Sequence, residues 1–473
     1  MSIQSWSVIR RVRSYLWDTQ KLSIKKQGLV ICPVRHKHLP PKLVSQMFIK
    51  FGKMPEVSPF SSKSHELFLF RSVLYPCHPG GFHLLPLGQR VLDKLIKIID
   101  QEMEMIGAQK LSLTTLAPKA VWSQSGRWES TGAELFKLKD RDKKEYCLGP
   151  THEELVTDMV RDLYLLKAAY PLKLYQITRK FRDEAHPRFG LLRGREFEMK
   201  DLYTFDRTLE NARNTYDIVC NAYTEIFKRL DLKVIKAEAA VGNIGGSLSH
   251  EFHLESEVGE DRVYKCLQCG HVANAEVTGM NDEKKPFCSK CGSNKLQQLS
   301  CIEVGHSFLL GTKYSEVFKA AYNQEGVGKS WLEMGCYGLG VTRLLQAMVE
   351  VNCLETRLKW PKVVAPYQVC VIPQKEGFMS YDLFNDAHRL ATELNNMDKL
   401  KGEVFMDDRI KRSIGQRLWD MKNLGIPYVV IVSSLDEGRM TGMYELQDVY
   451  KDQVYMLSEC ELIETLNLFA KTV

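Results

Sequence analysis

The chain has 473 residues, of which 44% are hydrophobic and 26% are charged, and its formal net charge is +7. This length suits two or three domains with separate cores, and no apolar run reaches the roughly 18 to 20 residues that a membrane span needs, so we expect no membrane association. Its thirteen cysteines occur without a secretory signal, which favours a reducing compartment where thiols stay free or bind metal.

Positive charge is concentrated near the N-terminus. Residues 1–55 contain eleven Lys or Arg residues and one acid, Asp18, whereas the rest of the chain carries 54 basic and 57 acidic residues. Apolar residues between Ile3 and Leu16 recur there at near-helical spacing, with Arg10, Arg11 and Arg13 among them. An acid-poor amphipathic start predicts a mitochondrial transit peptide and hence the mitochondrial matrix, with a basic nucleic-acid-binding arm as the alternative. We expect residues 1–59 to be this leader and a poorly ordered linker.

A long amphipathic helix is predicted after the leader. Apolar residues between Leu87 and Ile106 recur at helical spacing, and Gly107 closes the pattern. A strand that contains Leu111 and Leu113 is expected to follow.

A glycine and a proline at 149–150 predict a turn before another helix. Thr151 could cap that helix, which would begin at His152 with Glu153 and Glu154 in its first turn. On its own the pattern indicates no more than a capped helix.

The stretch 172–206 predicts a strand, a basic loop and a second strand. Arg182 and Glu184 are expected to share one face of the first strand, and Arg195 and Phe197 one face of the second. Guanidinium groups bind phosphate oxygens, an aromatic ring can stack on a base, and a carboxylate can accept from an exocyclic amine. The set therefore suits a nucleoside triphosphate; a solvated, charged hairpin is the alternative.

Four cysteines form two closely spaced pairs, each followed by glycine: Cys266, Cys269, Cys288 and Cys291. This spacing predicts a four-cysteine zinc ribbon, in which the zinc would be structural because four thiolates leave no open position for water. The alternative is four ordinary reduced thiols without metal.

Further along, His306 stands alone in a predicted strand and is either a satisfied core residue or part of a pocket. A second strand, a glycine turn and a helix are expected around Gly338 and Gly340, where glycine would let the backbone approach a ligand. Arg343 then falls in the first turn of the helix, where exposed amides favour phosphate. Cys336 is expected to form a small, buried pocket wall.

From Trp360 onward, strands alternate with helices and predict a mixed α/β module. Its basic residues Arg409 and Lys411 are plausible RNA contacts, as are Arg412, Arg417 and Lys422. A solvated helix face is the alternative for this group.

Several of these segments resemble the class II aminoacyl-tRNA synthetases. FRDE and RGREF are similar to motif 2, PRFG and MKDLYTFD to the bacterial and organellar prolyl branch, and GPTHEE to the loop of that branch in which Thr and Glu bind the proline amine. The helix from Leu87 resembles motif 1, although Thr114 stands where the family has proline. CYGLGVTR resembles motif 3, and the C-terminal module resembles the anticodon-binding domain.

The resemblance implies an α+β fold: an antiparallel class II sheet flanked by helices at residues 60–359, with a small cysteine insert at about 262–300, and a mixed α/β anticodon-binding domain at 360–473. It implies ATP-dependent ligation of L-proline to tRNA(Pro), with Mg²⁺ on the phosphates, in a homodimer. The alternative is a non-catalytic, synthetase-like RNA-binding or accessory subunit.

The resemblance also implies roles for single residues. Those for ATP are Arg182, Glu184, Arg195, Phe197, Gly338, Gly340 and Arg343, with Arg182 and Arg343 as the catalytic pair. Those for proline are Thr151, Glu153, Arg182, His306 and Cys336. Those for tRNA are Arg188, Arg193, Arg409 and Lys411. The segment between motifs 2 and 3 is too short for a full editing domain, so rejection of alanine would rest on the synthetic pocket or on a separate protein; a hydrophobic pocket rejects a smaller ligand by only about 1–3 kcal/mol.

Overall fold

The computed structural model describes residues 39–53, 62–163, 170–242, 244–279, 286–324, 326, 328–353, 356–377, 381–432 and 442–470. The predicted transit peptide lies outside the described residues, apart from the linker expected to follow it. In the part of the chain that is described, no helix has the length and apolar character needed to cross a bilayer.

The larger of two main sheets holds the candidate site. Within the described residues, nine strands join in the order β11-β10-β13-β12-β14-β17-β9-β8-β4, and β11 also pairs with β14. The strands are β4 (Gln109–Lys110), β8 (Leu172–Phe181), β9 (Glu196–Asp206), β10 (Ile235–Glu238), β11 (Leu248–Glu255), β12 (Asp261–Cys266), β13 (Val272–Asn274), β14 (Leu296–Gly311) and β17 (Glu333–Gly340). The central pairs are antiparallel, as predicted for this fold class.

Strands β8 and β9 form the predicted hairpin, in register from Leu172↔Phe205 to Phe181↔Glu196. One expectation was wrong: β8 ends at Phe181, so Arg182 and Glu184 lie in the connection and do not share a strand face. Arg195 likewise precedes β9, and Phe197 alone of the four lies on a strand. The amide of Arg182 still bonds the carbonyl of Arg195, but the next two amides leave the hairpin: that of Asp183 bonds the carbonyl of Glu134, and that of Glu184 bonds the carbonyl of Arg182.

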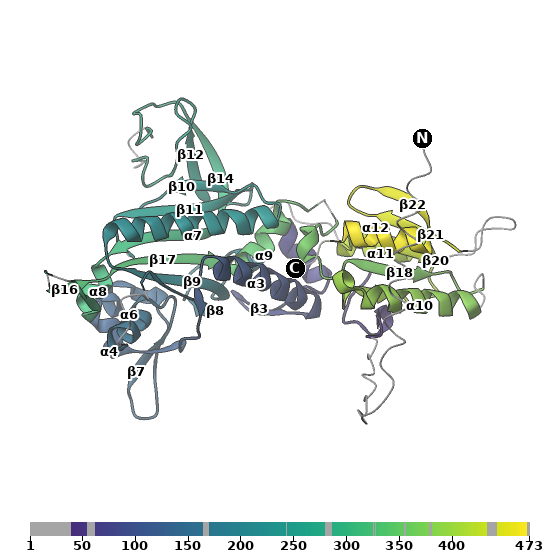
Figure 1. The fold of residues 1–473 in the computed structure, drawn as a ribbon, viewed down its shortest axis with the longest axis horizontal. Helices are drawn as coiled ribbons and strands as arrows, with labels where there is room; N and C mark the ends of the chain where they lie inside the picture. Colours follow the sequence, from purple (N-terminus) through teal and green to yellow (C-terminus); the bar gives the residue numbers. More distant parts are fainter. Residues whose placement is uncertain are drawn as a thin grey trace, which may run out of the picture. The chain divides into compact units, whose positions relative to one another are not determined.

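One face of the larger sheet is covered by three helices, α3 (Pro86–Met105), α7 (Leu209–Arg229) and α9 (Val341–Glu350). Helices α7 and α9 pack on the central strands, and α3 packs on α7 and α9. Figure 1 shows α3 and α7 running alongside the strands. Helix α3 buries the predicted apolar stripe, and Gly107 follows it with φ +70°, a conformation that glycine adopts without strain. The next strand, β4, is only Gln109–Lys110, so Leu111 and Leu113 lie beyond it, contrary to expectation.

The opposite face is covered at one end by four short helices, of which α4, α6 and α8 are labelled close together in Figure 1. They are α4 (Lys119–Gln124), α5 (Arg127–Ser130), α6 (Glu153–Asp162) and α8 (Lys313–Phe318). Side chains alternate along β9, so that Leu202 joins the core under α3 and α7, whereas Tyr203 and Phe205 join the core under α6 and α8. Beyond these helices the same face is open to the cavity described below.

The cysteine insert lies between β11 and β14 and projects from the sheet beyond α7 (Figure 1). Its described residues contain β12, β13 and two cysteine turns, and β12 pairs with the first part of β14. Because β14 continues into the centre of the sheet, the insert is joined directly to the strand that lines the cavity.

The smaller sheet confirms the predicted alternation of strands and helices after Trp360. Its described strands are ordered β1-β19-β18-β20-β21-β22. They are β1 (Lys42–Leu43), β18 (Val369–Pro373), β19 (Val404–Met406), β20 (Tyr428–Val432), β21 (Met443–Asp448) and β22 (Gln453–Ser458), with helices α10 (Tyr381–Asn396), α11 (Ile414–Leu424) and α12 (Glu459–Phe469).

The stretch 39–53 differs from the poorly ordered linker that was expected. Strand β1 pairs in parallel with β19, and Ser45 donates from its amide to Asp408 at 2.9 Å. The guanidinium of Arg409 lies over the ring of Phe51, 3.7 Å from its centroid. These contacts order the segment against the smaller sheet.

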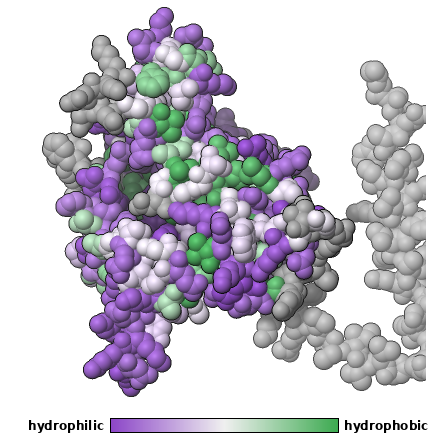
Figure 2. Space-filling view, turned by 90° about the vertical axis from the view of Figure 1, so that its left-hand side faces the viewer, coloured by the Kyte–Doolittle hydropathy of each residue, from purple (hydrophilic) through white to green (hydrophobic). Residues whose placement is uncertain are grey.

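The remaining described elements are short: α2 (Lys63–Phe70), the pair β2 (Leu74–His78) and β3 (Gly81–Leu84), the three-stranded set β5 (Leu116–Pro118), β6 (Lys137–Lys139) and β7 (Glu145–Leu148), and the pair β15 (Ala321–Gln324) and β16 (Gly328–Trp331). The turn between β6 and β7 is rich in Lys and Asp and forms the hydrophilic projection at the bottom of Figure 2.

Candidate active site

A cavity of about 340 Å³ lies over the open face of the larger sheet. Nine of the residues predicted to bind substrates line it: Thr151, Glu153, Arg182, Phe197, His306, Cys336, Gly338, Gly340 and Arg343. They come from α6, the β8–β9 hairpin, β14, β17 and α9, so segments far apart in the sequence meet at one site.

Arg182 and Arg343 both face this cavity. Burial lowers the pKa of Arg182, and the positive charge of Arg343 lowers it further, which places the two guanidinium groups within electrostatic reach. The Arg182 guanidinium lies over the ring of Phe197 at 5.3 Å from its centroid. Arg343, in the first turn of α9 as predicted, donates to the carbonyl of Glu303 at 3.1 Å. Two like charges over one cavity favour a polyanion such as a triphosphate.

Glu303 is a cavity residue that the sequence reasoning missed. Its carboxylate lies 3.6 Å from Arg343 and 3.3 Å from Nδ1 of His306. Burial would raise the pKa of Glu303, but the hydrogen bond and charge of His306, with Arg343, hold it at about 2. The only sequence signal was an acid close to His306 in a predicted strand. His306 also bonds Ser249 at 2.6 Å and stacks on Phe308.

Glu153 also lines the cavity; it is fully buried and accepts three kinds of donor. The hydroxyl of Thr151 donates to it at 2.7 Å, the thiol of Cys336 at 2.9 Å and the guanidinium of Arg127 at 2.9 Å. Thr151 was expected to cap α6, but the N-cap is His152, whose side chain makes no capping hydrogen bond. Cys336 forms the buried pocket wall that was predicted.

Glu184 and Arg195 take other places than those predicted. Arg195 does not line the main cavity: its Nε donates to the carbonyl of Glu184 at 2.9 Å and lies 3.4 Å from Asp183. Glu184 lines an adjoining cavity of about 220 Å³. The two cavities share Leu192, Glu303 and Arg343, so Glu184 is a neighbour of the main cavity and not part of its wall.

The two hairpin-loop arginines predicted to contact tRNA are held by acids. Arg193 forms ion pairs with Glu184 at 2.9 Å and with Glu260 at 2.6 Å, and Arg188 pairs with the other oxygen of Glu260. Glu260 immediately precedes β12, so these pairs tie the hairpin loop to the base of the cysteine insert.

The hairpin loop is also anchored from the motif 3 side. The buried amide of Gln346, on α9, accepts from the backbone of Leu191 at 2.7 Å and donates to the carbonyl of Phe189 at 2.9 Å. The same group donates to Ser62 at 3.2 Å, at the N-cap of α2. One side chain therefore fixes the loop after Arg182 against the helix that carries Arg343.

The glycine turn predicted before Arg343 is absent from this described stretch. Gly338 lies within β17, and β17 runs directly into α9 with Gly340 as its N-cap at φ −73°. Neither glycine is needed for a left-handed conformation. A Cβ at Gly338 would lie 3.6 Å from Met199, at the cavity wall, so glycine there keeps the strand backbone open to a ligand.

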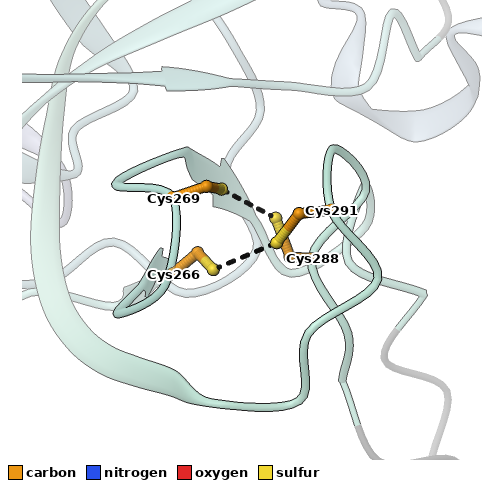
Figure 3. Close-up of side chains that lie close together, drawn as sticks. All are labelled: Cys266, Cys269, Cys288 and Cys291. Carbon is orange, nitrogen blue, oxygen red and sulfur yellow. Dashed lines mark hydrogen bonds between the residues drawn. The ribbon is translucent and has the colours of Figure 1, made fainter.

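The four cysteines converge at the tip of the insert (Figure 3), with all four sulfur atoms within 4.8 Å of one another. The distances Cys266–Cys291 and Cys269–Cys288 are both 3.6 Å. These are too long for disulfides, whose sulfurs lie about 2.05 Å apart. Tetrahedral zinc with Zn–S distances of about 2.3 Å would place its sulfurs about 3.8 Å apart. The arrangement therefore fits a zinc site.

The residues of the C-terminal module that were predicted to contact RNA differ in how exposed their side chains are. Arg409 is already paired with Asp407 at 2.6 Å and with Asp420 at 2.9 Å. Arg417 is buried and donates to the carbonyl of Pro373 at 2.7 Å, so its prediction as an RNA contact was wrong. Lys411 is exposed.

Comparison with protein families gives two matches. Residues 136–352 match the tRNA synthetase class II core domain (G, H, P, S and T), and residues 368–467 match the anticodon binding domain.

Among curated proteins, the chain is 48% identical over 378 residues to a Rattus norvegicus protein named "Probable proline–tRNA ligase, mitochondrial", covering 80% of this chain and 79% of that protein. The chain belongs to the proline–tRNA ligase family of class II synthetases. A Schizosaccharomyces pombe member of the same name is 40% identical, covering 78% of this chain and 86% of its own. The resemblance inferred from the motifs is thereby confirmed.

Solved structures share the proline–tRNA ligase fold at low sequence identity. The prolyl-tRNA synthetase of Cryptosporidium parvum complexed with L-proline and AMP has a TM-score of 0.69 and 17% identity, covering 86% of this chain and 74% of its own. The Giardia lamblia enzyme in complex with prolyl-adenylate has a TM-score of 0.70 and 19% identity, covering 85% and 76%.

Proposed function

We propose that this proline–tRNA ligase family member activates L-proline with ATP to prolyl-adenylate and transfers the prolyl group to tRNA(Pro). The observation that carries the proposal is that Arg182 and Arg343 line one cavity together with Thr151 and Glu153. Cationic groups for phosphate thus lie at one end, and a buried carboxylate for a cationic amine at the other.

The chemistry needs positioning and charge stabilisation more than proton transfer. An ionised proline carboxylate attacks the α-phosphorus, the new oxygen–phosphorus bond forms, and the bond to the β-phosphate breaks to release pyrophosphate. Arg182 is placed to hold the α-phosphate and the proline carboxylate, and Arg343 the far end of the triphosphate. Phe197 is placed to stack on adenine. The terminal ribose hydroxyl of the tRNA then attacks the prolyl carbonyl and releases AMP.

At the proline end, Thr151 and Glu153 would receive the secondary ammonium group, with Cys336 and His306 closing the pocket. Glu184 would accept from the adenine amine at the boundary of the adjoining cavity. Arg195 is left out of the proposed ATP contacts, because its guanidinium donates to the loop backbone at Glu184.

The residues present fit two metal ions. Glu303 is an ionised oxygen donor between the two cavities and would hold Mg²⁺, which neutralises phosphate charge when bound. The four cysteines of the insert would hold a structural Zn²⁺, since all four positions are filled by sulfur.

For the larger partners, we propose tRNA contacts by Arg188 and Arg193 at the acceptor end and by Lys411 in the anticodon-binding domain, with Arg409 supporting that surface. We propose a catalytic domain at 60–359 with its insert at 262–300, an anticodon-binding domain at 360–473, a homodimer through the motif 1 region, and action in the mitochondrial matrix. The similarity to mitochondrial relatives supports the location.

The rival function is a non-catalytic RNA-binding or accessory subunit. Such a protein would have no need to keep two phosphate-binding arginines in one cavity, and this chain retains both. The proposal of an active ligase is therefore preferred.

The test is ATP–pyrophosphate exchange with a panel of amino acids. We expect exchange with proline, and a loss of at least about 100-fold in Arg182→Ala, because hydrogen bonds to charged groups in a transition state are worth several kcal/mol. Arg179→Ala is the matched control: Arg179 lies on β8, three residues before Arg182, is 67% exposed and pairs with Glu196. Exchange that ignores proline, or a fully active Arg182→Ala, would contradict the proposal.

A further inference from the structure

Arg127 is a cavity residue to which neither the motifs nor the comparisons assign a role. It begins α5, directly after Gly126, whose φ of +77° turns the chain into the helix. One nitrogen of its guanidinium, Nη1, donates to Glu153 at 2.9 Å and to both oxygens of Glu154 at 3.1 and 3.2 Å. The guanidinium lies over the ring of Trp122 at 5.0 Å, so α4 fixes its plane. Its side chain is only 10% exposed.

The arrangement places two adjacent buried carboxylates on a single cation. Burial would raise the pKa of Glu153, but the charge of Arg127 and hydrogen bonds from Cys336, Thr151 and Arg127 hold it below its usual range. Burial raises the pKa of Glu154, and Arg127 offsets this only in part. The two carboxylates thus differ. Glu153, which lines the cavity, is kept ionised, whereas burial disfavours the ionised form of Glu154.

Glu154 is not among the residues that line the cavity, and Ser125 also donates to it at 2.8 Å. It therefore provides a second attachment for Arg127 outside the cavity wall. Without that attachment a single ion pair would leave the guanidinium free to follow Glu153 or to reach into the pocket.

We propose that Arg127 is a positioning residue for the proline subsite: it fixes the Glu153 carboxylate at the cavity wall and keeps it ready for the cationic amine of the amino acid. This inference rests on the proposed function. Its consequence is selective, because the guanidinium acts on the amine end of the cavity and the triphosphate end is built from other elements.

A pH profile can separate this role from a purely structural one. The titratable groups facing Glu153 come from several elements: Arg127 on α5, His152 and Glu154 at the start of α6, Arg182 after β8, Tyr203 on β9, Lys313 and Tyr314 on α8, and Cys336 on β17. Of these, Arg127 is the largest influence that keeps Glu153 ionised. Its removal should therefore raise the pKa of Glu153 and move the acid limb of kcat/KM for proline to higher pH.

The experiment measures proline-dependent pyrophosphate exchange by the full chain and by Arg127→Ala, Arg127→Lys and Arg161→Ala. Arg161 is the matched control, because it lies on α6 but is 32% exposed and pairs with Asp158. We expect Arg127→Ala to raise KM for proline by about 10- to 100-fold, the worth of a hydrogen bond to a charged group, with KM for ATP changed less than about twofold. Arg127→Lys should restore the acid limb in part, and Arg161→Ala should change neither quantity.

Circular dichroism and thermal melting report whether each variant folds. If Arg127→Ala does not fold, Arg127→Lys carries the test. We expect a rise in KM for proline of about threefold to tenfold, because lysine keeps the charge but lacks the planar guanidinium that lies over Trp122. Unchanged KM for proline and an unshifted acid limb in a folded variant would overturn the inference, as would equal rises in KM for proline and ATP. Absence of proline-dependent exchange in the unmodified chain would instead refute the proposed function.

Discussion

One side chain, Gln346, links the motif 2 hairpin loop to the motif 3 helix through hydrogen bonds, and a single substitution can remove them. Replacing Gln346 by leucine keeps its approximate volume on α9 but removes its three hydrogen bonds, to the backbone of Leu191, the carbonyl of Phe189 and the hydroxyl of Ser62. The side chain is fully buried, so water cannot easily take its place.

The cost follows from the groups left without partners. A buried donor or acceptor without a partner costs about 1–3 kcal/mol. Two backbone groups of the loop are affected, so we expect the free energy of unfolding to fall by about 2–4 kcal/mol. At roughly 2–4 °C per kcal/mol for a domain of 150 to 250 residues, the melting temperature should fall by roughly 4–16 °C.

Function should change at one end of the cavity. Leu191 and Leu192 line the wall nearest the hairpin loop, whereas Glu153 lies on α6. We therefore expect KM for ATP to rise several-fold and KM for proline to stay within about twofold.

The assay combines thermal melting with pyrophosphate exchange at varied ATP and varied proline. Gln89→Leu is the control, because Gln89 is exposed on α3 and its side-chain amide donates to Asp93 on the same helix, at 2.8 Å; surface changes of this kind stay within about 0.5 kcal/mol. A Gln346→Leu variant that melts like the unmodified protein and keeps its KM for ATP would refute the reasoning.

Two further predictions concern metal and pH. Purified protein should contain about one zinc per chain, and Cys266→Ser should lower it; less than about half an equivalent in the unmodified protein, by elemental analysis, would remove the zinc site. Burial lowers the pKa of Lys200 to about 7, against about 10.4 in an unfolded chain. The unfolded state therefore binds more protons between these values, so stability should rise with pH from about 7 to 10. Lys200→Met should flatten that rise in melting temperature, and an equally steep rise in the variant would contradict the assignment.

The parts of the fold that local pattern determines could be predicted. Helix α3, the β8–β9 hairpin and the alternation after Trp360 all follow from the spacing of apolar residues and turn residues, which the structure keeps. Nine of the cavity residues could also be named, because the motifs of the family fix which residues carry the chemistry.

What could not be predicted depends on contacts between distant segments. Arg127 reaches Glu153 across separate helices, and nothing in its own neighbourhood signals that contact. The position of Arg195 was predicted wrongly because the β8–β9 ladder ends at the pair Phe181 and Glu196. Arg182 and Arg195 lie just beyond that pair, so their side chains do not follow strand alternation. The burial of Arg417 depends on carbonyls from other elements of the smaller sheet, which spacing alone does not reveal.

The central claim is that Arg182 and Arg343 act on one triphosphate beside a proline held at Glu153. A crystal structure with proline and a non-hydrolysable ATP analogue tests it most directly. We predict both guanidinium groups in contact with the phosphates of the same nucleotide, and the proline nitrogen within hydrogen-bonding distance of Glu153. A nucleotide bound elsewhere, or either arginine turned to solvent in that complex, would contradict the account.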